Sequence, residues 1–533
     1  MVFIRKTISE MIDAVARERP GSEALVHAEA NVRYDYGHLV SAVDRISRGL
    51  LSARIRRGEK VALWGPNIPE WIVAFLALAK MGAVTVPIDP GAGQESLRFI
   101  LTHSDCSAMV MAEGPASSGE HVRVALNVRK RAPQLREIFL IAQRSHPEMT
   151  SWADLEALGR DVEPQVLNDR AEAITPEDPV AIMYTSGTTG TPKGVVLDHL
   201  GLINKSMFST KRQGIHHTDR LCLFFPLFHM FGNTCIALAG LFRGAALILP
   251  CRTFDPSKIL KTIHAEACTA LYASPSMLIA LIEHPDFDAH RWSSVQKGTI
   301  GGAPCPMELM RRLVEDIGVS DITVGYGITE TCSWVTMTRP GDPIERRVCT
   351  IGIPLECNEL KVADPGTGED LPPETQGEIC TRGFLMKEYH KMPRATAAAI
   401  DRNGWFHTGD LGEMDEQGYV RVTGRLKDVI IRDGVEIYPV NLEEMIYRLP
   451  EISEVQVFGF PHPEKGQEVA AWVKLKEGRR LTVEKLAAYV QDQTDAATAP
   501  HFFEIVSDFP MTRSGKVQKF KLAEMAQKAY LEK

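Results

Sequence analysis

The sequence lacks several features that would place it in a specialised class of protein. Its ten cysteines include no Cys-x-x-Cys pair, and no histidines and cysteines have the spacing of a zinc site. This argues for free thiols in a reducing cytoplasm and against a structural metal. The net charge is −8, so nucleic acid is not an expected partner. The first residues, Met-Val-Phe-Ile-Arg-Lys, contain no apolar segment typical of a signal peptide, and the expected location is cytoplasmic.

Long uncharged runs are scarce as well. Residues 221–242 contain no Asp, Glu, Lys or Arg and are long enough to cross a bilayer. However, a proline, a histidine, a glycine and an asparagine interrupt this stretch. We therefore expect a short strand at Leu221–Phe225, a turn and a buried helix at Thr234–Phe242, and no transmembrane segment.

The rest of the composition is that of an ordinary globular protein with more than one domain. The chain has 533 residues, of which 44% are hydrophobic and 24% are charged. Helix and strand patterns alternate through the N-terminal part, which predicts sheets covered by helices on both faces. The clearest of these elements are Ile8–Glu18, Tyr36–Leu51, Lys60–Trp64, Glu70–Met81, Ala270–Ala273, Lys297–Ile300 and Asp321–Tyr326.

The C-terminal part has a different pattern. After Thr350, short strands among glycine and proline turns predict a small β-rich subdomain, and beyond residue 425 a compact α+β pattern begins. The expected fold class is α/β, with a large N-terminal domain at residues 1–425 and a small C-terminal domain at residues 426–533. The elements expected in the small domain include Val440–Arg448, Glu454–Gly459, Glu468–Leu475, Val483–Gln493 and Lys519–Lys533.

A segment rich in glycine and hydroxyl groups follows the apolar strand pattern that ends at Tyr184. Residues 184–195 read Tyr-Thr-Ser-Gly-Thr-Thr-Gly-Thr-Pro-Lys-Gly-Val. Glycines allow the backbone to approach an oxyanion, hydroxyls and N–H groups can surround it, and Lys193 adds a positive charge. The order differs from the common P-loop, in which Ser or Thr follows the lysine. The alternative is a surface loop that is merely rich in Gly and Thr.

Two further segments follow predicted strands. The first is Gly301-Gly-Ala-Pro304, and the second, about twenty residues later, is Gly325-Tyr-Gly-Ile-Thr-Glu330. Tyr326 offers a flat face to a purine, Thr329 can donate to a phosphate oxygen, and Glu330 is an oxygen ligand suited to Mg²⁺. For any one of these residues, a capped strand end with a solvated carboxylate is the simpler interpretation.

The later part of the chain adds an acidic turn and two lysines. Asp410 lies in Trp-Phe-His-Thr-Gly-Asp-Leu, where a carboxylate can accept from ribose hydroxyls or can merely stabilise its own turn. Arg425 and Lys427 lie in Gly-Arg-Leu-Lys-Asp. Lys516 lies in Pro-Met-Thr-Arg-Ser-Gly-Lys-Val, where a solvated lysine is the plain alternative.

Together these motifs resemble those of the adenylate-forming superfamily, which includes acyl-CoA synthetases, aryl-CoA ligases, beetle luciferases and peptide-synthetase adenylation domains. They occur in the family order from Tyr184 to Lys516, and the chain is most similar to an AMP-forming acyl-CoA synthetase. The resemblance implies an α/β fold with a mobile C-terminal domain that turns about a hinge at Lys427. It also implies an ATP site formed by Thr185, Ser186, Gly187, Thr188, Thr189, Gly190, Lys193, Gly302, Ala303, Pro304, Tyr326, Thr329, Asp410 and Arg425.

The resemblance assigns roles to the remaining residues. Lys516, Lys193, Thr329 and Glu330 are the implied catalytic residues, and Glu330 is the implied ligand of Mg²⁺. His229 is carried over to the wall of the acyl pocket, with a core histidine as its alternative. Gly327 stands where acetate-specific relatives have Trp, which implies room for a longer or wider acyl group. Glu436 departs from the family pattern, because many relatives have Asn, Gln or His there.

The implied reaction is the two-step synthesis of an acyl-CoA. ATP and a carboxylate give acyl-AMP and pyrophosphate, and coenzyme A then displaces AMP. The expected substrate is a medium- or long-chain fatty, alicyclic or aromatic acid. No carrier segment follows Lys516, so free coenzyme A is the expected acceptor. The alternatives are an acyl-AMP ligase that serves a carrier protein, and a non-catalytic binding protein on the same fold; a homodimer is left open.

Overall fold

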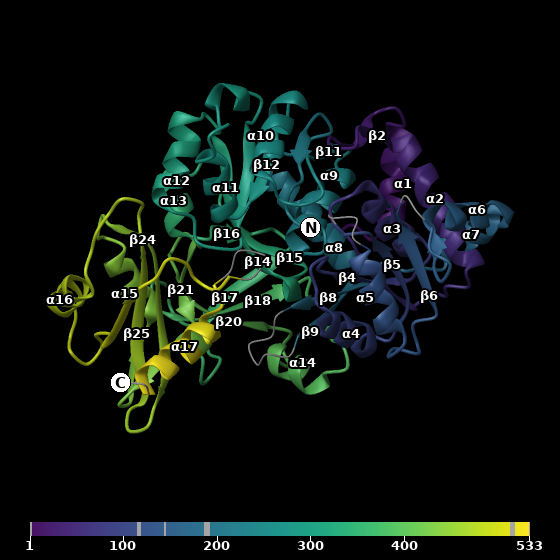
Figure 1. The fold of residues 1–533 in the computed structure, drawn as a ribbon. Coiled ribbons are helices and arrows are strands. Elements are labelled where there is room, and N and C mark those ends of the chain that lie inside the picture. Colours follow the sequence, from purple (N-terminus) through teal and green to yellow (C-terminus); the bar gives the residue numbers. More distant parts are fainter. Residues whose placement is uncertain (1–2, 115–118, 143–144, 186–191, 512–516, 532–533) are drawn as a thin grey trace. The chain divides into compact units, whose positions relative to one another are not determined.

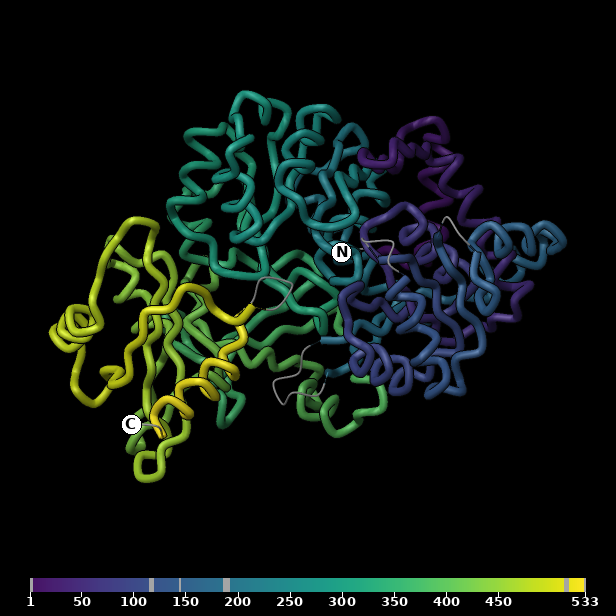
Figure 2. The backbone as a smooth tube through the Cα atoms, in the orientation of Figure 1, coloured from purple at the N-terminus to yellow at the C-terminus, as the bar shows by residue number. Residues whose placement is uncertain are grey.

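The computed structural model describes residues 3–114, 119–142, 145–185, 192–511 and 517–531. The chain packs into two compact units. The first contains Met1–Glu359 and Arg382–Phe406, and the second contains Leu360–Thr381 and His407–Lys533. The chain therefore passes between the units after Glu359, Thr381 and Phe406. Figure 2 traces the backbone from the N-terminus in purple to the C-terminus in yellow.

Two large mixed sheets form the first unit (Figure 1). Within the described residues, one has nine strands, which are parallel in the centre and antiparallel at both edges. In spatial order they are β16 (Ile353–Pro354), β15 (Ser333–Met337), β14 (Asp321–Ile328), β13 (Lys297–Gly301), β12 (Ala270–Ala273), β10 (Arg220–Cys222), β11 (Ala246–Leu249), β1 (Glu23–His27) and β2 (Val32–Asp35).

The other large sheet has eight strands in the part of the chain that is described. Its centre is again parallel, and β9 and β19 form an antiparallel edge. The order is β19 (Glu388–Tyr389), β9 (Lys193–Asp198), β8 (Pro179–Thr185), β4 (Val84–Ile88), β3 (Lys60–Trp64), β5 (Cys106–Ala112), β6 (Glu137–Ile141) and β7 (Thr150–Ser151).

Helices cover these sheets. The α-helices of the first unit are α1 (Ile8–Glu18), α2 (Tyr36–Ser52), α3 (Pro69–Lys80), α4 (Gln94–His103), α5 (Glu120–Arg129), α6 (Trp152–Leu158), α7 (Pro164–Glu172), α8 (His199–Gln213), α9 (Ala239–Phe242), α10 (Pro256–Ala265), α11 (Pro275–Ile282), α12 (Met307–Arg311), α13 (Ile344–Cys349) and α14 (Pro393–Ala399). Short 3-10 turns are η1 (Gly159–Asp161), η3 (Ala289–Trp292) and η5 (Thr329–Thr331). Two π-helices are η2 (Phe231–Leu238) and η4 (Arg312–Asp316).

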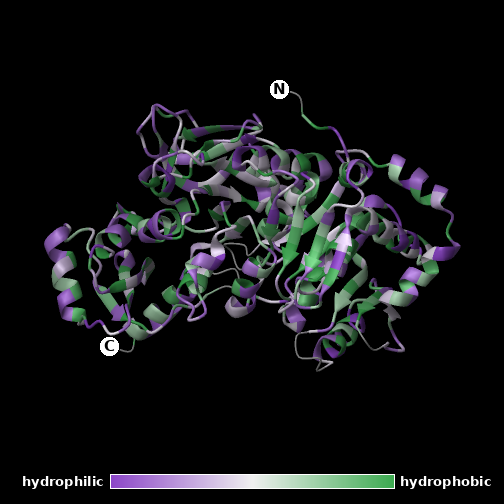
Figure 3. Ribbon diagram, turned by 90° about the horizontal axis from the view of Figure 1, so that it is seen from above, coloured by the Kyte–Doolittle hydropathy of each residue, from purple (hydrophilic) through white to green (hydrophobic). Residues whose placement is uncertain are grey.

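Helix α3 shows why the two large sheets belong to one unit. Every residue of α3 except Glu70 is buried, as expected for a helix that is apolar on nearly all sides. Its side chains belong to a core that also contains side chains of β1 and β3, one strand from each large sheet. Lys80 is buried too, but its ammonium is paired with Asp13 at 3.0 Å and Asp44 at 2.7 Å. Figure 3 shows the apolar strands inside the layers of mixed-polarity helices.

The second unit contains most of a four-stranded sheet and all of a five-stranded sheet among the described residues. The four-stranded sheet has the order β17 (Asn358–Ala363), β18 (Gly377–Gly383), β20 (Phe406–Met414) and β21 (Val420–Arg425), followed by η6 (Leu426–Asp428). The other sheet has the order β23 (Val435–Ile437), β22 (Ile430–Arg432), β25 (Gly466–Leu475) and β24 (Ile452–His462), with β26 (Phe502–Ile505) beside β25. Its helices are α15 (Pro439–Ile446), α16 (Val483–Gln493) and α17 (Lys519–Leu531).

The expected division after residue 425 stays a prediction. The compact units place β18, β20 and β21 with the C-terminal residues, whereas the sequence pattern groups these strands with the N-terminal part. All ten cysteines fall among the described residues, and all are free thiols, as expected.

Candidate active site

Thr185 and Lys193 lie opposite each other on two antiparallel strands. They form the last cross-strand pair of β8 and β9. The connection between these strands contains five predicted phosphate ligands that lie outside the described residues: Ser186, Gly187, Thr188, Thr189 and Gly190. The strand pairing therefore places the two described ends of the expected phosphate loop side by side.

Tyr389, which no sequence motif selected, connects Lys193 with Glu330. The Lys193 ammonium lies over its ring, with Nζ 4.7 Å from the ring centroid. The Tyr389 hydroxyl donates a hydrogen bond of 2.8 Å to Oε1 of Glu330. Burial, and then the charge of Glu330, raises the pKa of this hydroxyl well above its usual value. A predicted phosphate-binding cation and a predicted metal ligand thus meet on one buried aromatic side chain.

The backbone around Tyr389 connects the same two places. In β19, Tyr389 pairs with Val195 of β9. The His390 amide donates to the carbonyl oxygen of Gly194 at 2.7 Å, and the Met386 amide donates to that of Glu330 at 2.7 Å. The segment 386–390, which contains this short strand, is therefore hydrogen-bonded both to the strand that follows the expected phosphate loop and to the turn that carries Glu330.

Glu330 lies in a tight turn between β14 and β15. The Thr331 hydroxyl accepts from the Ile328 amide at 3.2 Å and donates to the Ser333 carbonyl at 2.8 Å. Cys332 and Ser333 have φ angles of 55° and 112°, which non-glycine residues rarely adopt. Such backbone persists only where its surroundings hold it, and it is frequent at functional sites.

The predicted adenine residues meet at the carboxyl edge of the nine-stranded sheet. Gly301 of β13 pairs with Gly325 of β14. Gly302, Ala303 and Pro304 therefore leave the sheet beside Tyr326, at the edge where open α/β sheets bind ligands. These three residues are exposed, whereas Tyr326 is half-buried.

Trp334 is a second residue that the sequence motifs did not indicate. A Cβ atom on Gly301 would lie 2.6 Å from its ring, and one on Gly325 would lie 2.9 Å from it. The ring also packs edge-to-face on Phe231, with centroids 5.0 Å apart. Its buried indole nitrogen has no hydrogen-bond partner among the described residues. A glycine within a strand can indicate that another group lies close, and this is the signal by which the sequence could have pointed to such a neighbour.

The environment of Gly327 differs from the expected open space. A Cβ atom there would lie 2.1 Å from the carbonyl oxygen of Ser333, which belongs to the neighbouring strand β15. The pairing of β14 with β15 shifts register between Tyr326 and Gly327. Close approach of backbone therefore requires glycine at this position. The role of Gly327 in the acyl pocket stays a prediction.

His229 lies in a sharp turn before the π-helix η2. Its Nδ1 accepts from the Phe231 amide at 3.1 Å, which places the proton of the neutral ring on Nε2. The ring is 5.3 Å from that of Phe225. A Cβ atom on Gly232 would lie 2.2 Å from the carbonyl oxygen of Pro226, so the chain folds closely on itself here. His229 and Trp334 thus both have aromatic neighbours in the segment 225–231.

The second unit holds the predicted ribose residues. Asp410 and Arg425 are a cross-strand pair of β20 and β21, and Nε of Arg425 lies 3.0 Å from Oδ1 of Asp410. Asp410 is 5% exposed. Lys427 is exposed in the turn η6, directly after β21. Lys516 lies outside the described residues.

The unusual residue Glu436 has a partner in its own hairpin. Its Oε2 accepts a hydrogen bond of 2.8 Å from the hydroxyl of Tyr438. Glu436 is exposed in β23, and Tyr438, which directly follows this strand, is half-buried. The acid that departs from the family pattern is thus engaged by a local hydroxyl.

Magnesium fits the donor chemistry of Glu330. A carboxylate offers two oxygens with about four acceptor positions, and Mg²⁺ prefers such hard oxygen ligands. The hydroxyl of Tyr389 uses one acceptor position of Oε1. The half-buried side chain therefore keeps acceptor capacity for a cation.

Two family models cover most of the chain. Residues 12–390 match the model described as AMP-binding enzyme, and residues 441–516 match the model described as AMP-binding enzyme C-terminal domain. The chain belongs to the AMP-binding enzyme family. The expected membership of the adenylate-forming superfamily is confirmed.

Relatives of this AMP-binding enzyme are similar to it along nearly its whole length. YngI of Bacillus subtilis (strain 168), whose name assigns it to the acyl-CoA synthetases, is 38% identical and covers 98% of this chain and 97% of that protein. The mitochondrial medium-chain acyl-CoA ligase ACSF2 of Danio rerio is 33% identical, and the match covers 98% of this chain and 88% of that ligase. ATP-bound MatB from Rhodopseudomonas palustris has a TM-score of 0.84 at 26% identity, covering 98% and 99%. The predicted α/β fold class is confirmed.

The uncharged stretch at residues 221–242 of this AMP-binding enzyme forms β10, the turn with His229, η2 and α9. In the described part of the chain, no helix combines the length and apolar character needed to span a bilayer.

Proposed function

We propose that this chain is an AMP-forming ligase that activates a carboxylic acid with ATP and transfers it to coenzyme A. The observation that carries the proposal is the joint contact of Lys193 and Glu330 with Tyr389, beside the ends of the expected phosphate loop. Family membership over both domains and the names of YngI and the Danio rerio ligase support the same reaction class.

In the first step, a carboxylate oxygen attacks the α-phosphorus of ATP. A new O–P bond forms, the bond to the bridging oxygen of the β-phosphate breaks, and pyrophosphate leaves. Catalysis of such a step relies on positioning and on positive charge at the phosphates. Lys193 supplies one charge on a side chain that is held against Tyr389. We assign a second charge to Lys516.

Glu330 is the proposed holder of Mg²⁺. The ion would neutralise charge on the phosphate oxygens. The chain's own contribution is orientation, because the strained turn at Cys332 and Ser333 and the hydroxyl of Tyr389 fix where the carboxylate points. The ion pair of Asp410 and Arg425 presents a fixed carboxylate for the ribose hydroxyls.

In the second step, the thiol of coenzyme A attacks the acyl carbon. A C–S bond forms, the bond from the acyl carbon to the AMP oxygen breaks, and the thiol proton is released. We assign the change between the two steps to movement about Lys427, so that one active site performs both reactions.

The proposed substrate is a fatty, alicyclic or aromatic acid of medium or greater length. The residues near His229 are largely apolar, with aromatic rings at Phe225, Phe231 and Trp334. The ligase from Danio rerio is named for medium-chain acids. A homodimer stays a prediction, which light scattering of the purified protein tests.

A carboxylate screen tests the proposed reaction. The purified chain is given ATP, Mg²⁺, coenzyme A and single acids from acetate to long-chain fatty and aromatic acids, and pyrophosphate, AMP and thioester are measured. We expect all three products in equal amounts with an apolar acid. Pyrophosphate without thioester, together with transfer to a holo-carrier protein, would identify an acyl-AMP ligase. No product with any acid would contradict an enzymatic function.

The role of Lys516 has its own test. We expect Lys516→Ala to abolish formation of acyl-AMP and to spare thioester formation from supplied acyl-AMP, because the positive charge is needed at the α-phosphate only in the first step. Lys521→Ala, which changes an exposed lysine of α17, is the matched control. Equal loss of both half-reactions would indicate a structural role.

A further inference from the structure

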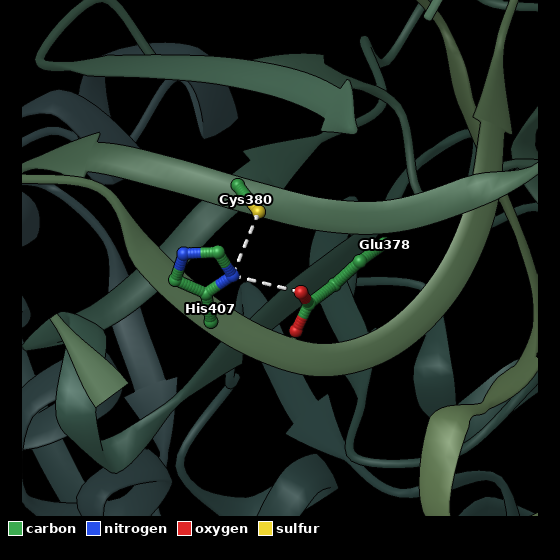
Figure 4. A group of neighbouring side chains, drawn as sticks. All are labelled: Glu378, Cys380 and His407. Atoms are coloured by element: carbon green, nitrogen blue, oxygen red, sulfur yellow. Dashed lines mark hydrogen bonds and ion pairs between the residues drawn. The ribbon is translucent and has the colours of Figure 1, made fainter. Parts of the chain in front are cut away.

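Three metal-ligating side chains, none of which is among the site residues predicted above, converge in the four-stranded sheet. Glu378 and Cys380 are alternate residues of β18 and therefore lie on one face of that strand. His407 is at the start of the adjacent strand β20. Nδ1 of His407 lies 2.8 Å from Oε2 of Glu378 and 3.6 Å from Sγ of Cys380. Figure 4 shows both groups approaching this one ring nitrogen.

We propose that Glu378, Cys380 and His407 form a binding site for a divalent transition ion of the zinc type. The three ligand atoms lie within 4.8 Å of one another. A thiolate, an imidazole nitrogen and a carboxylate oxygen are all zinc ligands, and the sulfur and nitrogen distinguish this set from the oxygen ligands of Mg²⁺.

The distances suit a tetrahedral ion. Typical Zn–S and Zn–N bonds of about 2.3 and 2.0 Å place sulfur and nitrogen about 3.5 Å apart, close to the separation of Cys380 and His407. Nitrogen and oxygen ligands would be about 3.3 Å apart, so the Glu378 carboxylate must move about 0.5 Å away from the ring. A small rotation of the carboxylate achieves this.

Burial and charge favour the same conclusion. Cys380 is 0% exposed and Glu378 is 6% exposed, while the His407 side chain is 29% exposed. An ion of charge +2 bound by one thiolate and one carboxylate gives a neutral group, which is the form that a buried position tolerates. With three protein ligands, a water molecule would be the fourth ligand of a tetrahedral ion.

Binding exchanges a proton for the ion. The thiol of Cys380 loses its proton to solvent, and the proton of Nδ1 moves to Nε2, so that one proton leaves for each ion bound. Sequence spacing could not indicate this site, because Glu-x-Cys and a single distant histidine match no zinc motif.

Cobalt is the probe for the site. Co²⁺ added to the chelator-treated full chain should produce one equivalent of a tetrahedral visible spectrum with a thiolate-to-metal absorption band, release one proton, and be displaced by Zn²⁺ but not by excess Mg²⁺. Cys380→Ser should abolish the thiolate band and weaken binding at least about tenfold. Cys349→Ser is the matched control, because Cys349 is exposed and lies outside the cluster. It should leave the band unchanged.

The cobalt titration of the wild-type chain tests whether the metal site exists even if a variant fails to fold. Absence of a thiolate band in the wild-type chain would overturn the proposal, as would a band that survives in Cys380→Ser or disappears in Cys349→Ser. These measurements do not depend on the ligase assignment, because no substrate is present.

One enzymatic consequence rests on the proposed function. Oε1 of Glu378 accepts a hydrogen bond of 2.9 Å from the Gly409 amide, next to Asp410. Movement of this carboxylate toward an ion would therefore disturb the turn that carries the ribose ligand. We expect saturating Zn²⁺ to raise the KM for ATP about tenfold in the wild type and not in Cys380→Ser. An unchanged KM would overturn this consequence, while the cobalt result would still decide the site.

Discussion

At the scale of single residues, Tyr389 is the side chain on which the candidate phosphate and metal residues meet. Tyr389→Phe removes the hydroxyl that donates to Glu330 and keeps the ring beneath Lys193. We expect kcat/KM for ATP in pyrophosphate exchange to fall about tenfold or more, since a hydrogen bond to a charged group contributes about 1.5–3 kcal/mol. The exchange rate measured over a range of Mg²⁺ concentrations checks this.

Two further variants test whether the fall in pyrophosphate exchange comes from loss of the Tyr389 hydroxyl. Tyr530→Phe removes an exposed hydroxyl that is bonded to His462 in the second unit, and it should leave exchange unchanged. Tyr389→Leu also removes the ring, so it should reduce exchange more than Tyr389→Phe. Full activity of Tyr389→Phe would show that Glu330 does not need this donor.

Residue types that form short motifs could be identified from the sequence, whereas partners from distant segments could not. The motifs indicated Asp410 and Arg425, and the structure pairs them across two strands. Tyr389 lies far from Glu330 in the sequence. It belongs to a strand of two residues, which is too short to show an alternation of apolar and polar residues. Trp334 could be inferred only indirectly, from the glycines that make room for it.

At the scale of elements, the contact of β14 with β15 depends on Gly327. Gly327→Ala places a Cβ atom 2.1 Å from a carbonyl oxygen of β15, so the strands must separate. We expect destabilisation by about 2–4 kcal/mol, measured as a fall of several degrees in Tm. Gly341→Ala is the control, because nothing lies within 4 Å of the corresponding Cβ position. A Tm equal to that of the control would mean that β15 adjusts without cost.

The N-terminus of α1 gives a pH-dependent contact with α8. The Ile8 amide donates to Nδ1 of His199 at 3.1 Å. His199 is 1% exposed, and burial lowers its pKa from 6.5 to about 4, against a smaller opposing effect of Asp178. The unfolded chain therefore binds a proton more readily than the folded chain between pH 6.5 and 4. The free energy of unfolding is therefore highest above pH 6.5 and decreases as the pH falls. At pH 5 the decrease is about 2 kcal/mol.

His199→Asn tests this pH dependence. Asparagine can keep an acceptor for the Ile8 amide but cannot be protonated. We expect the fall in Tm between pH 7 and pH 5 to be several degrees smaller in this variant than in the wild type. His264→Asn, at an exposed position of α10, should retain the wild-type fall. An identical fall in all three proteins would contradict the assignment to His199.

Elements with a strong local pattern were predicted more accurately than those shaped by neighbours. The bounds of α1, α16 and β12 agree with the prediction, because apolar spacing and end signals lie within each segment. The helix expected at Thr234–Phe242 begins earlier, as the π-helix η2. At its start Gly232 approaches the backbone of Pro226 closely, a contact that periodicity does not encode. No strand was expected at β9, whose first residues follow a glycine-rich loop.

At the scale of the whole molecule, two chemical steps are assigned to one chain with a hinge at Lys427. Lys427→Pro fixes φ and removes a backbone donor at this position. We expect pyrophosphate exchange to stay near the wild-type rate and thioester formation to fall at least about tenfold, since the second step needs the change about the hinge. Lys427→Ala, which leaves the backbone free, should retain both. Parallel decline of both rates in the folded proline variant would show that Lys427 is not the pivot.

The division of the chain into units also determines which parts of each unit remain together after a protease cut, and where a unit can be exchanged with that of a homologue. The chain passes from one unit to the other after Glu359, Thr381 and Phe406. A protease cut at the first or second passage therefore leaves part of the first unit on each fragment, and a cut after residue 425 leaves part of the second unit on both. A nicked molecule should elute from gel filtration with its fragments together. Exchange of a whole unit with a homologue requires matched breakpoints at all three passages.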